Sequence, residues 1–175
     1  MNVRPRIAWG ITGAGHFLTE VAELLRAMQD VDLFLSQAGE EVIKNYRLEG
    51  MLASASATVY YDRAASAPAV NKLHLGYYRL AVVAPATSNS VAKFVCGISD
   101  NLISNLFAQA GKARIPILVL PTDVAPELTS TAPAGKVTVY PRPIDQENVR
   151  RLEAFPGVSV VKNADDLKLC LSTYL

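Results

Sequence analysis

Glycines and a histidine stand together in Gly10-Ile-Thr-Gly-Ala-Gly-His16, directly after an apolar run. Small residues let backbone N–H groups approach an anion, and the positive end of a following helix adds to the attraction. The segment is not a dinucleotide-binding fingerprint. Leu18 stands at the position of that motif's third glycine, and Ser36, at the end of the second predicted strand, stands where the motif needs Asp or Glu. A terminal phosphate, held by amides and by Ser and Thr hydroxyls, fits these residues better. The alternative is that the glycines only form a tight turn.

A second polar cluster, Pro85-Ala-Thr-Ser-Asn-Ser90, follows the most buried of the predicted strands. One polar side chain is enough to cap the start of a helix, so three hydroxyls and one carboxamide exceed what capping needs. The surplus groups fit hydrogen bonding to a flat heteroaromatic ring that has alternating donors and acceptors. Helix capping alone remains the alternative.

Two further side chains are candidates for ligand contacts. Asp100, in the segment Gly97-Ile-Ser-Asp-Asn-Leu102, is the only acid between positions 63 and 122, and we expect it to accept a hydrogen bond from a ligand or a loop. His16 lies in the glycine segment, where we expect it to meet a phosphate or a bound ring. A structural role is the alternative for each histidine, His16 and His74.

Alternating short strands and helices must position these residues. The sequence predicts strands at 6–12, 31–36, 79–84, 115–120, 137–140 and 158–161. It predicts helices at 17–29, after Ser36, from about Ser90 to about Gly111, and from about Asp165. For residues 51–70 the sequence predicts a loop or a short helix. The stretch 121–135 predicts a loop without regular structure, which in a compact domain is typical of a lid or a binding segment.

This alternation predicts an α/β fold with a doubly wound parallel sheet and right-handed crossovers. Ligands of such sheets bind beyond the carboxyl ends of the strands, near the point where the strand order reverses. The loops expected at those ends are TGAGH at 12–16, SQAGE at 36–40, PATSNS at 85–90 and PTDVAPE at 121–127.

Length and composition limit the class of protein. The chain has 175 residues, which suits one domain over 1–175. Hydrophobic residues make up 50%, which excludes disorder, and 17 basic against 16 acidic residues argue against nucleic-acid or membrane-surface partners. Two cysteines and two histidines make a disulfide framework or a metal site implausible. Because no apolar run reaches the length of a membrane span, we expect a cytoplasmic protein.

Charged residues make up only 19% of the chain, below the usual value of about 25%. Apolar surface that meets another subunit would explain this shortage. A well-filled core is the alternative explanation.

The polar segments together resemble the FMN-binding pattern of the cysteine-decarboxylase-like flavoproteins. The matching residues, in order and spacing, are ITGAG at 11–15, Ser36, PATSNS at 85–90 and GISDNL at 97–102. This family includes cysteine decarboxylases, flavin prenyltransferases, archaeal flavoproteins and dihydromethanopterin reductases. The resemblance implies a single Rossmann-like (flavodoxin-like) three-layer domain that binds FMN. It also implies a homo-oligomer, a trimer or an assembly of trimers, with FMN between subunits.

Within this resemblance, the FMN phosphate is expected on the 13–15 loop with Ser36, and the ring near Thr87–Ser90. The cofactor-binding residues that the resemblance implies are Gly13, Ala14, Gly15, His16, Ser36, Thr87, Ser88, Asn89, Ser90 and Asp100.

Departures from the family pattern separate the activities. His74 lies only eleven residues before Pro85, closer than the catalytic histidine of the decarboxylases, and PTDVAPEL at 121–128 replaces their P-x-M-N-x-x-M-W motif. The Arg-Glu pair of the prenyltransferases is also missing at that point. GAGH at 13–16 and YPRPID at 140–145 resemble instead the branch of archaeal flavoproteins and dihydromethanopterin reductases.

That branch implies reduction of dihydromethanopterin, or a related dihydropterin, to the tetrahydro form, with NAD(P)H or a ferredoxin as electron donor. Reduction of the C=N bond needs a hydride from the reduced flavin and an acid for the ring nitrogen. The candidates for this acid are His16, Asp123 and water. Two alternatives remain open: an FMN electron-transfer protein without a substrate of its own, and a cysteine decarboxylase that depends on His74.

Overall fold

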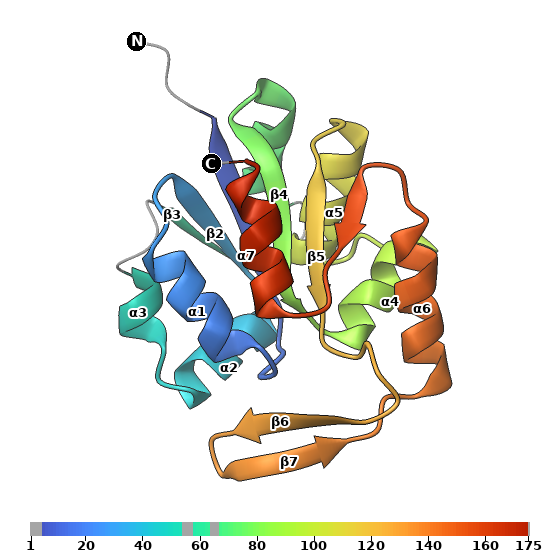
Figure 1. Ribbon diagram of the computed structural model, residues 1–175. Helices are drawn as coiled ribbons and strands as arrows, with labels where there is room; N and C mark the ends of the chain where they lie inside the picture. The colour runs from blue at the N-terminus through green and yellow to red at the C-terminus, as the bar shows by residue number, and fades with distance from the viewer. Residues whose placement is uncertain (1–4, 54–57, 64–66, 175) are drawn as a thin grey trace.

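Six parallel strands form the central sheet of the computed structural model, which describes residues 5–53, 58–63 and 67–174. Their order is β3-β2-β1-β4-β5-β8 (Figure 1). The strands are β1 (Arg6–Ile11), β2 (Val31–Leu35), β3 (Thr58–Tyr61), β4 (Tyr78–Ala86), β5 (Ile117–Pro121) and β8 (Val158–Val160). The predicted α/β fold with a doubly wound parallel sheet is confirmed.

Helices cover both faces of this sheet (Figure 1). One face packs against α1 (Leu18–Arg26), α2 (Gln37–Asn45), α3 (Glu49–Ala53) and α7 (Ala164–Ser172). The other packs against the 3-10 helix η1 (Pro68–Leu75) and against α4 (Ser88–Cys96), α5 (Leu102–Lys112) and α6 (Pro143–Glu153). Because side chains alternate along a strand, Ile7 and Trp9 of β1 enter one core cluster and Ala8 enters the other. The result is three layers.

The single helix expected from about Ser90 to about Gly111 is wrong, because this region forms two helices. Gly97, with φ of 70°, ends α4 in the left-handed conformation that glycine adopts without strain. Asn101 then caps α5, and its side chain accepts a hydrogen bond from the N–H of Ser104. Gly97 and Asn101, which lower helix propensity, therefore end α4 and begin α5.

The loop or short helix expected at 51–70 is also only partly right. Residues 54–57 and 64–66 of that range lie outside the described residues. Between these two segments, β3 pairs with β2 and forms the edge strand of the sheet. The 3-10 helix η1 follows the second segment, at Pro68–Leu75. Helix α6 is a further element that the sequence patterns did not indicate.

The structureless loop expected at 121–135 is right only for residues 122–127, which connect β5 to the next strand. Strand β6 (Leu128–Ala132) pairs antiparallel with β7 (Gly135–Val139) to form a hairpin. The strand expected at 137–140 belongs to this hairpin and not to the central sheet. Figure 1 shows the hairpin apart from the central sheet, next to the carboxyl ends of its strands.

No helix among the described residues is long and apolar enough to cross a membrane.

A buried carboxylate connects the amino-terminal ends of β1, β2 and β4. These strand ends lie on the side of the sheet away from the hairpin. Asp32 of β2 accepts hydrogen bonds from the Arg6 Nε at 3.0 Å and from the Tyr78 hydroxyl at 2.9 Å. The Asp32 side chain is only 5% exposed, so these hydrogen bonds replace the contacts with water that its oxygens lose on folding. Burial, and next the bond to Asp32, raise the pKa of Tyr78, which keeps this hydroxyl a proton donor.

Replacing Asp32 by Asn is expected to destabilise the fold by about 2 kcal/mol, because it removes the charged acceptor of the hydrogen bonds from Arg6 and Tyr78. Urea denaturation at fixed protein concentration measures the effect. The control is Asp30→Asn, since Asp30 pairs with the same arginine at 3.5 Å but is 49% exposed, and exposed pairs contribute less than about 1 kcal/mol. Equal losses in the two variants would contradict this account of Asp32.

Candidate functional site

The strand order reverses between β1 and β4, and a cavity of about 600 Å³ lies at the carboxyl ends of these strands. This is the point at which open α/β sheets bind their ligands. The residues that line the cavity are Thr12, Gly13, Ser36, Gln37, Ala38, Asp62, Arg63, Thr87, Asn89, Ser90, Asp100 and Asn101. We call this cavity the switch-point pocket.

The N-termini of three helices meet at the switch-point pocket. Ser36, Thr87 and Asn101 are the N-caps of α2, α4 and α5, and all three line the cavity. The side-chain oxygens of Ser36 and Thr87 accept backbone N–H bonds from Gly39 and Ser90, at 2.9 and 3.2 Å. The Ser36 hydroxyl hydrogen remains able to donate to a ligand, while the Thr87 and Ser90 hydroxyls lie 3.0 Å apart, so one of them donates to the other and the second can donate to a ligand. The positive ends of three helix dipoles therefore face one cavity, which favours an anion.

Gly13 allows the loop after β1 to approach the start of α2 closely. A Cβ at Gly13 would lie 2.6 Å from the Cβ of Ala38, and one at Gly39 would lie 2.5 Å from the carbonyl oxygen of Ile11. Both distances are shorter than non-bonded atoms can approach, whether the pair is two carbons or a carbon and an oxygen. The first glycine segment is thus more than a flexible turn, because its lack of side chains sets the shape of the cavity.

The two carboxylates of the switch-point pocket are already engaged. Both oxygens of Asp100 lie 2.8 Å from the Lys93 Nζ, and this ammonium lowers the pKa of Asp100. The Asp62 Oδ1 accepts the N–H of Leu102 at 3.0 Å, at the start of α5. Arg63 adds a positive charge to the lining. Both carboxylates are therefore compensated by hydrogen-bond partners within the protein. Together with Arg63, this reduces the repulsion that an anionic ligand would meet.

Six lining residues were not among the candidate site residues: Thr12, Gln37, Ala38, Asp62, Arg63 and Asn101. Asp62 and Arg63 directly follow β3, so recognition of that strand would have added them as a further strand-end loop. Asn101 stands within the quoted GISDNL segment, and Gln37 and Ala38 within SQAGE.

The other sequence candidates line an adjoining cavity of about 290 Å³, which we call the hairpin pocket. Thr87 lines both cavities. The hairpin pocket brings His16 and Asp123, the candidate acids, together with Ala14, Gly15 and Ser88. The remaining walls come from Tyr46, Thr122 and the hairpin residues Leu128, Ser130, Ala132, Val137 and Val139. The ten predicted cofactor residues are thus divided between two neighbouring pockets.

The environment of His16 favours the neutral imidazole. Burial lowers its pKa below the ordinary value, while the carboxylates of Glu20 and Asp123 act in the opposite direction with smaller effect. The His16 ring also lies 3.9 Å from the Phe17 ring, centroid to centroid. Near pH 7 His16 therefore acts through a neutral ring, which can donate one hydrogen bond and accept another.

His74 lies outside both pockets. It is exposed near the end of η1, and its Nε2 lies 3.0 Å from the Oε1 of Gln109, close to the C-terminus of α5. The histidine on which the decarboxylase alternative depends therefore contacts the surface of α5 and no residue of either cavity.

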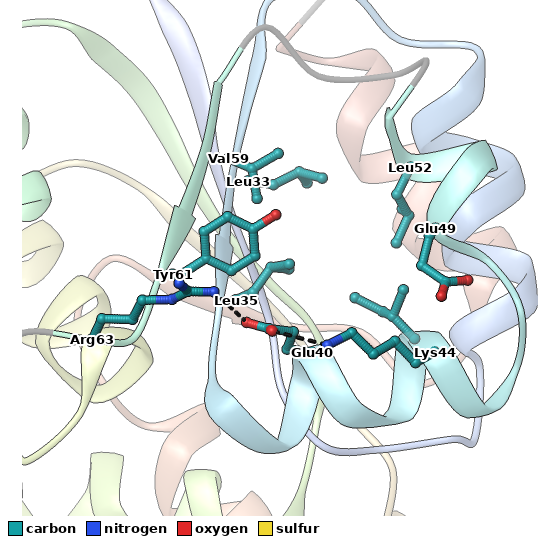
Figure 2. A pocket seen from close by; sticks show the side chains of 10 residues that line it. Leu33, Leu35, Glu40, Lys44, Glu49, Leu52, Val59, Tyr61 and Arg63 are labelled. Carbon is teal, nitrogen blue, oxygen red and sulfur yellow. Dashed lines mark hydrogen bonds and ion pairs between the residues drawn. The ribbon is translucent and has the colours of Figure 1, made fainter.

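A third cavity, of about 280 Å³, lies between α2, α3 and the edge of the sheet (Figure 2). Its walls are Leu33, Leu35, Ile43, Leu52 and Val59, and charged groups stand at its rim. Figure 2 shows the Glu40 carboxylate between Lys44 and Arg63, at 3.1 and 3.6 Å. None of the predicted site residues lines this cavity, and it does not lie between β1 and β4. It is less suited to a phosphorylated ligand than the switch-point pocket.

Within the described part of the chain, no group of three or more His, Cys, Asp or Glu side chains is arranged to hold a metal ion.

Comparison with known proteins gives consistent results. The model of the Flavoprotein family matches residues 1–172. The dihydromethanopterin reductase (acceptor) of Methanocaldococcus jannaschii is 34% identical, over 98% of this chain and 74% of that protein. The enzyme of the same name from Methanosarcina mazei is 35% identical, over 86% of this chain and 65% of that protein.

Among solved structures, DmrB of Burkholderia xenovorans in complex with FMN, described as a cubic protein cage for redox transfer, superposes with a TM-score of 0.90. It is 40% identical to this chain, and the match covers 100% of this chain and 97% of DmrB.

Asp123→Asn is expected to lower the pKa of His16 further, because it removes a negative charge that stabilises the imidazolium. Glu20→Gln should act in the same direction. NMR titration of the histidine ring protons measures the effect, and His74→Gln assigns the two histidine signals. A His16 pKa that stays the same or rises in both variants would contradict the charge arrangement of the hairpin pocket.

Proposed function

Because this chain belongs to the Flavoprotein family, we propose that it is an FMN-dependent oxidoreductase that reduces dihydromethanopterin, or a related dihydropterin, to the tetrahydro form. FMN is its cofactor, as the family and the FMN complex of DmrB indicate. The observation that carries the proposal is the switch-point pocket, where three helix N-termini converge beside a loop without bulky side chains. The homologous dihydromethanopterin reductases support the substrate class.

The residues of the switch-point pocket fit the phosphate of FMN. Ser36, Thr87 and Ser90 present hydroxyl groups, and the loop at Gly13 leaves room for backbone N–H groups to approach. Hydroxyl and amide donors at helix N-termini are the usual ligands of a phosphate group. Asn89 adds a carboxamide that can donate to negative charge on the cofactor.

When bound, FMN supplies the redox chemistry, the transfer of a hydride to a C=N bond. The chain has to hold the substrate and to provide a proton for the ring nitrogen. His16 and Asp123 line the pocket next to the cofactor site, so either can hold a water molecule that supplies this proton. A neutral His16 donates its remaining N–H as a hydrogen bond, and the Asp123 carboxylate, whose charge acts on His16, accepts one, which leaves water as the source of the transferred proton near pH 7.

We further infer that the protein works as a homo-oligomer in the cytoplasm, as a trimer or an assembly of trimers. Large apolar side chains stay exposed on the single chain: Tyr61, Leu75, Tyr77, Ile98, Val137, Val139, Tyr140, Ile144 and Leu169. Such residues on a chain with few charges are typical of subunit interfaces. The cage formed by DmrB supports this inference. The electron donor is NAD(P)H or a ferredoxin.

The first test is the absorption spectrum followed by reoxidation kinetics. Purified protein is expected to be yellow or to take up FMN, and its reduced flavin should reoxidise rapidly when dihydromethanopterin is added without oxygen. Formation of the tetrahydro product confirms the substrate. Colourless protein that does not bind FMN would overturn the cofactor. Fast electron exchange with a ferredoxin, without acceleration by any dihydropterin, would favour the electron-transfer alternative over the reductase.

Gly13→Ala is expected to weaken FMN binding at least about tenfold, because the new methyl group would lie 2.6 Å from Ala38 and push the loop away from α2. The matched control is Gly111→Ala on α5, where an added Cβ meets nothing within 4 Å. That change should keep FMN affinity and stabilise the helix by about 0.5–1 kcal/mol. Fluorescence titration of FMN measures both affinities. An unchanged affinity in Gly13→Ala would exclude this loop from the cofactor site.

A further inference from the structure

Arg63 stands between two cavities of different chemistry. It lines the switch-point pocket, and it also lines the third cavity, between α2, α3 and the edge of the sheet, which we call the edge cavity. No other described residue lines both cavities. The Arg63 side chain is 72% exposed, so no packing fixes its guanidinium group in one place. An arginine in this position can serve either cavity.

In this structure the Arg63 guanidinium faces the edge cavity, where its contacts are weak. Its Nη2 lies 3.6 Å from the Glu40 Oε2, as Figure 2 shows, which is longer than a hydrogen bond. Its central carbon lies 4.8 Å from the centroid of the Tyr61 ring. Exposed ion pairs and exposed cation–π contacts each contribute little free energy. The guanidinium can therefore leave these partners at low cost.

Glu40 remains paired when Arg63 leaves. The Lys44 Nζ donates to the Glu40 Oε1 at 3.1 Å, one turn further along α2. The hydrogen bond from Lys44 is the main reason that the pKa of Glu40 lies below its ordinary value, and Arg63 has a smaller effect in the same direction. Loss of the arginine therefore does not leave an uncompensated carboxylate.

The backbone next to Arg63 is fixed beside the switch-point pocket. The N–H of Asp62 donates to the carbonyl oxygen of Leu35, at the end of β2, at 3.1 Å. The Asp62 carbonyl oxygen accepts a bond from the Gln37 side chain at 3.2 Å, and the Asp62 carboxylate accepts the N–H of Leu102 at 3.0 Å. These bonds connect the end of β3 to the starts of α2 and α5. Only the arginine side chain has to move to change cavities.

The charges of the switch-point pocket favour this movement once a phosphate is present. Among the described residues that line this pocket, Arg63 has the only cationic side chain, and Asp62 and Asp100 are acidic. A phosphate monoester carries close to two negative charges at neutral pH. A guanidinium binds phosphate through two parallel charge-assisted hydrogen bonds, which are stronger than a loose pair with a carboxylate.

We propose that Arg63 exchanges Glu40 for the phosphate group of FMN when the cofactor binds, and that this exchange makes the site select phosphorylated flavin over riboflavin. The assignment rests on the proposed function only through its cofactor and is independent of the molecule that is reduced. Arg63 is then a specificity-determining residue of the cofactor site. Glu40 is a positioning residue, which holds the guanidinium at the boundary of the two cavities before the cofactor arrives.

The decisive experiment compares two flavins that differ only in the phosphate group. Fluorescence titrations measure the affinities of FMN and riboflavin for Arg63→Gln and for the unchanged protein. The variant is expected to bind FMN about tenfold more weakly, because a charged hydrogen-bond donor is lost. Its affinity for riboflavin should stay within about twofold, because riboflavin has no group for the arginine to bind.

Lys44→Gln is the matched control. It removes one positive charge from a partner of the same carboxylate, but Lys44 does not line the switch-point pocket. Its affinities for both flavins should stay within about twofold of the unchanged protein, because the charge it removes is exposed and remote from the phosphate. Circular dichroism and sedimentation velocity show whether each variant keeps its fold and its oligomeric state.

Glu40→Gln tests the positioning role. It releases Arg63, so FMN affinity should rise about threefold while riboflavin affinity is unchanged. Removing a carboxylate also weakens its direct repulsion of the phosphate, and the double variant Glu40→Gln/Arg63→Gln separates the two effects. If Glu40 acts through Arg63, the gain from Glu40→Gln is lost in the double variant. An equal gain with and without Arg63 would refute the exchange of partners.

Phosphorus NMR of bound FMN observes the phosphate directly. A guanidinium beside the phosphate stabilises its dianion, so Arg63→Gln should raise the second pKa of the bound phosphate group. A titration that is the same in the variant and in the unchanged protein would show that Arg63 does not reach the phosphate.

Other outcomes of the flavin titrations also decide against the assignment. Equal losses of FMN and riboflavin affinity in Arg63→Gln would mean that the arginine only supports the fold of the pocket. Dissociation of the oligomer with an unchanged preference for FMN would mean that Arg63 belongs to a subunit interface.

Failure of the proposed function gives a different result. A protein that binds neither flavin overturns both the cofactor and the assignment. A protein whose preference for FMN depends on Arg63 but which reduces no dihydropterin overturns the reductase activity alone and supports the assignment.

Discussion

One buried hydroxyl group connects the two strands between which the site is built. The Thr12 Oγ1 donates to the carbonyl oxygen of Pro85 at 2.9 Å and accepts the N–H of Thr87 at 2.9 Å. Thr12 follows β1, while Pro85 and Thr87 lie at the end of β4, so these bonds cross the point where the strand order reverses. On the other side of β4, the N–H of Thr122 donates to Ala86 at 3.0 Å. The ends of β1, β4 and β5 are therefore fixed relative to one another by the protein alone.

This constraint explains why the site can attract an anion with few cations in its walls. Because the strand ends are fixed, the N-caps Ser36 and Thr87 hold α2 and α4 with their N-termini toward the same cavity. Dipoles fixed in place need no reorganisation when a charge arrives, which makes them effective in a partly enclosed site. The buried ion pair of Asp32 and Arg6 lies at the opposite ends of the strands, where it stabilises the sheet without opposing the field at the site.

The sequence predicted the parts of the site that depend on local chemistry. Glycines that admit a close approach and hydroxyls that cap a helix can be recognised from neighbouring residues, and the predicted Gly13, Ser36 and Thr87 do line one cavity. Strand β3 has four residues, none of them fully buried, and gave no periodic signal, so Asp62 and Arg63 were missed with it. Only the first strand of the hairpin was predicted as a loop, because β6 is rich in Thr and Ser. Its place depends on Tyr46, which is 85 residues away from its partner Thr131.

The two pockets are built from different kinds of structure, and this has a consequence for specificity. The switch-point pocket is formed by strand ends and helix N-termini of the central fold, so its shape changes only if the sheet changes. Five of the thirteen residues that line the hairpin pocket come from a ribbon outside the sheet, and the exposed side chains of its strand β7 carry little of the folding free energy. Substitutions on the hairpin can therefore alter the ligand that is accepted while the cofactor site remains intact. A single fold can in this way keep one cofactor and change the molecule that is reduced.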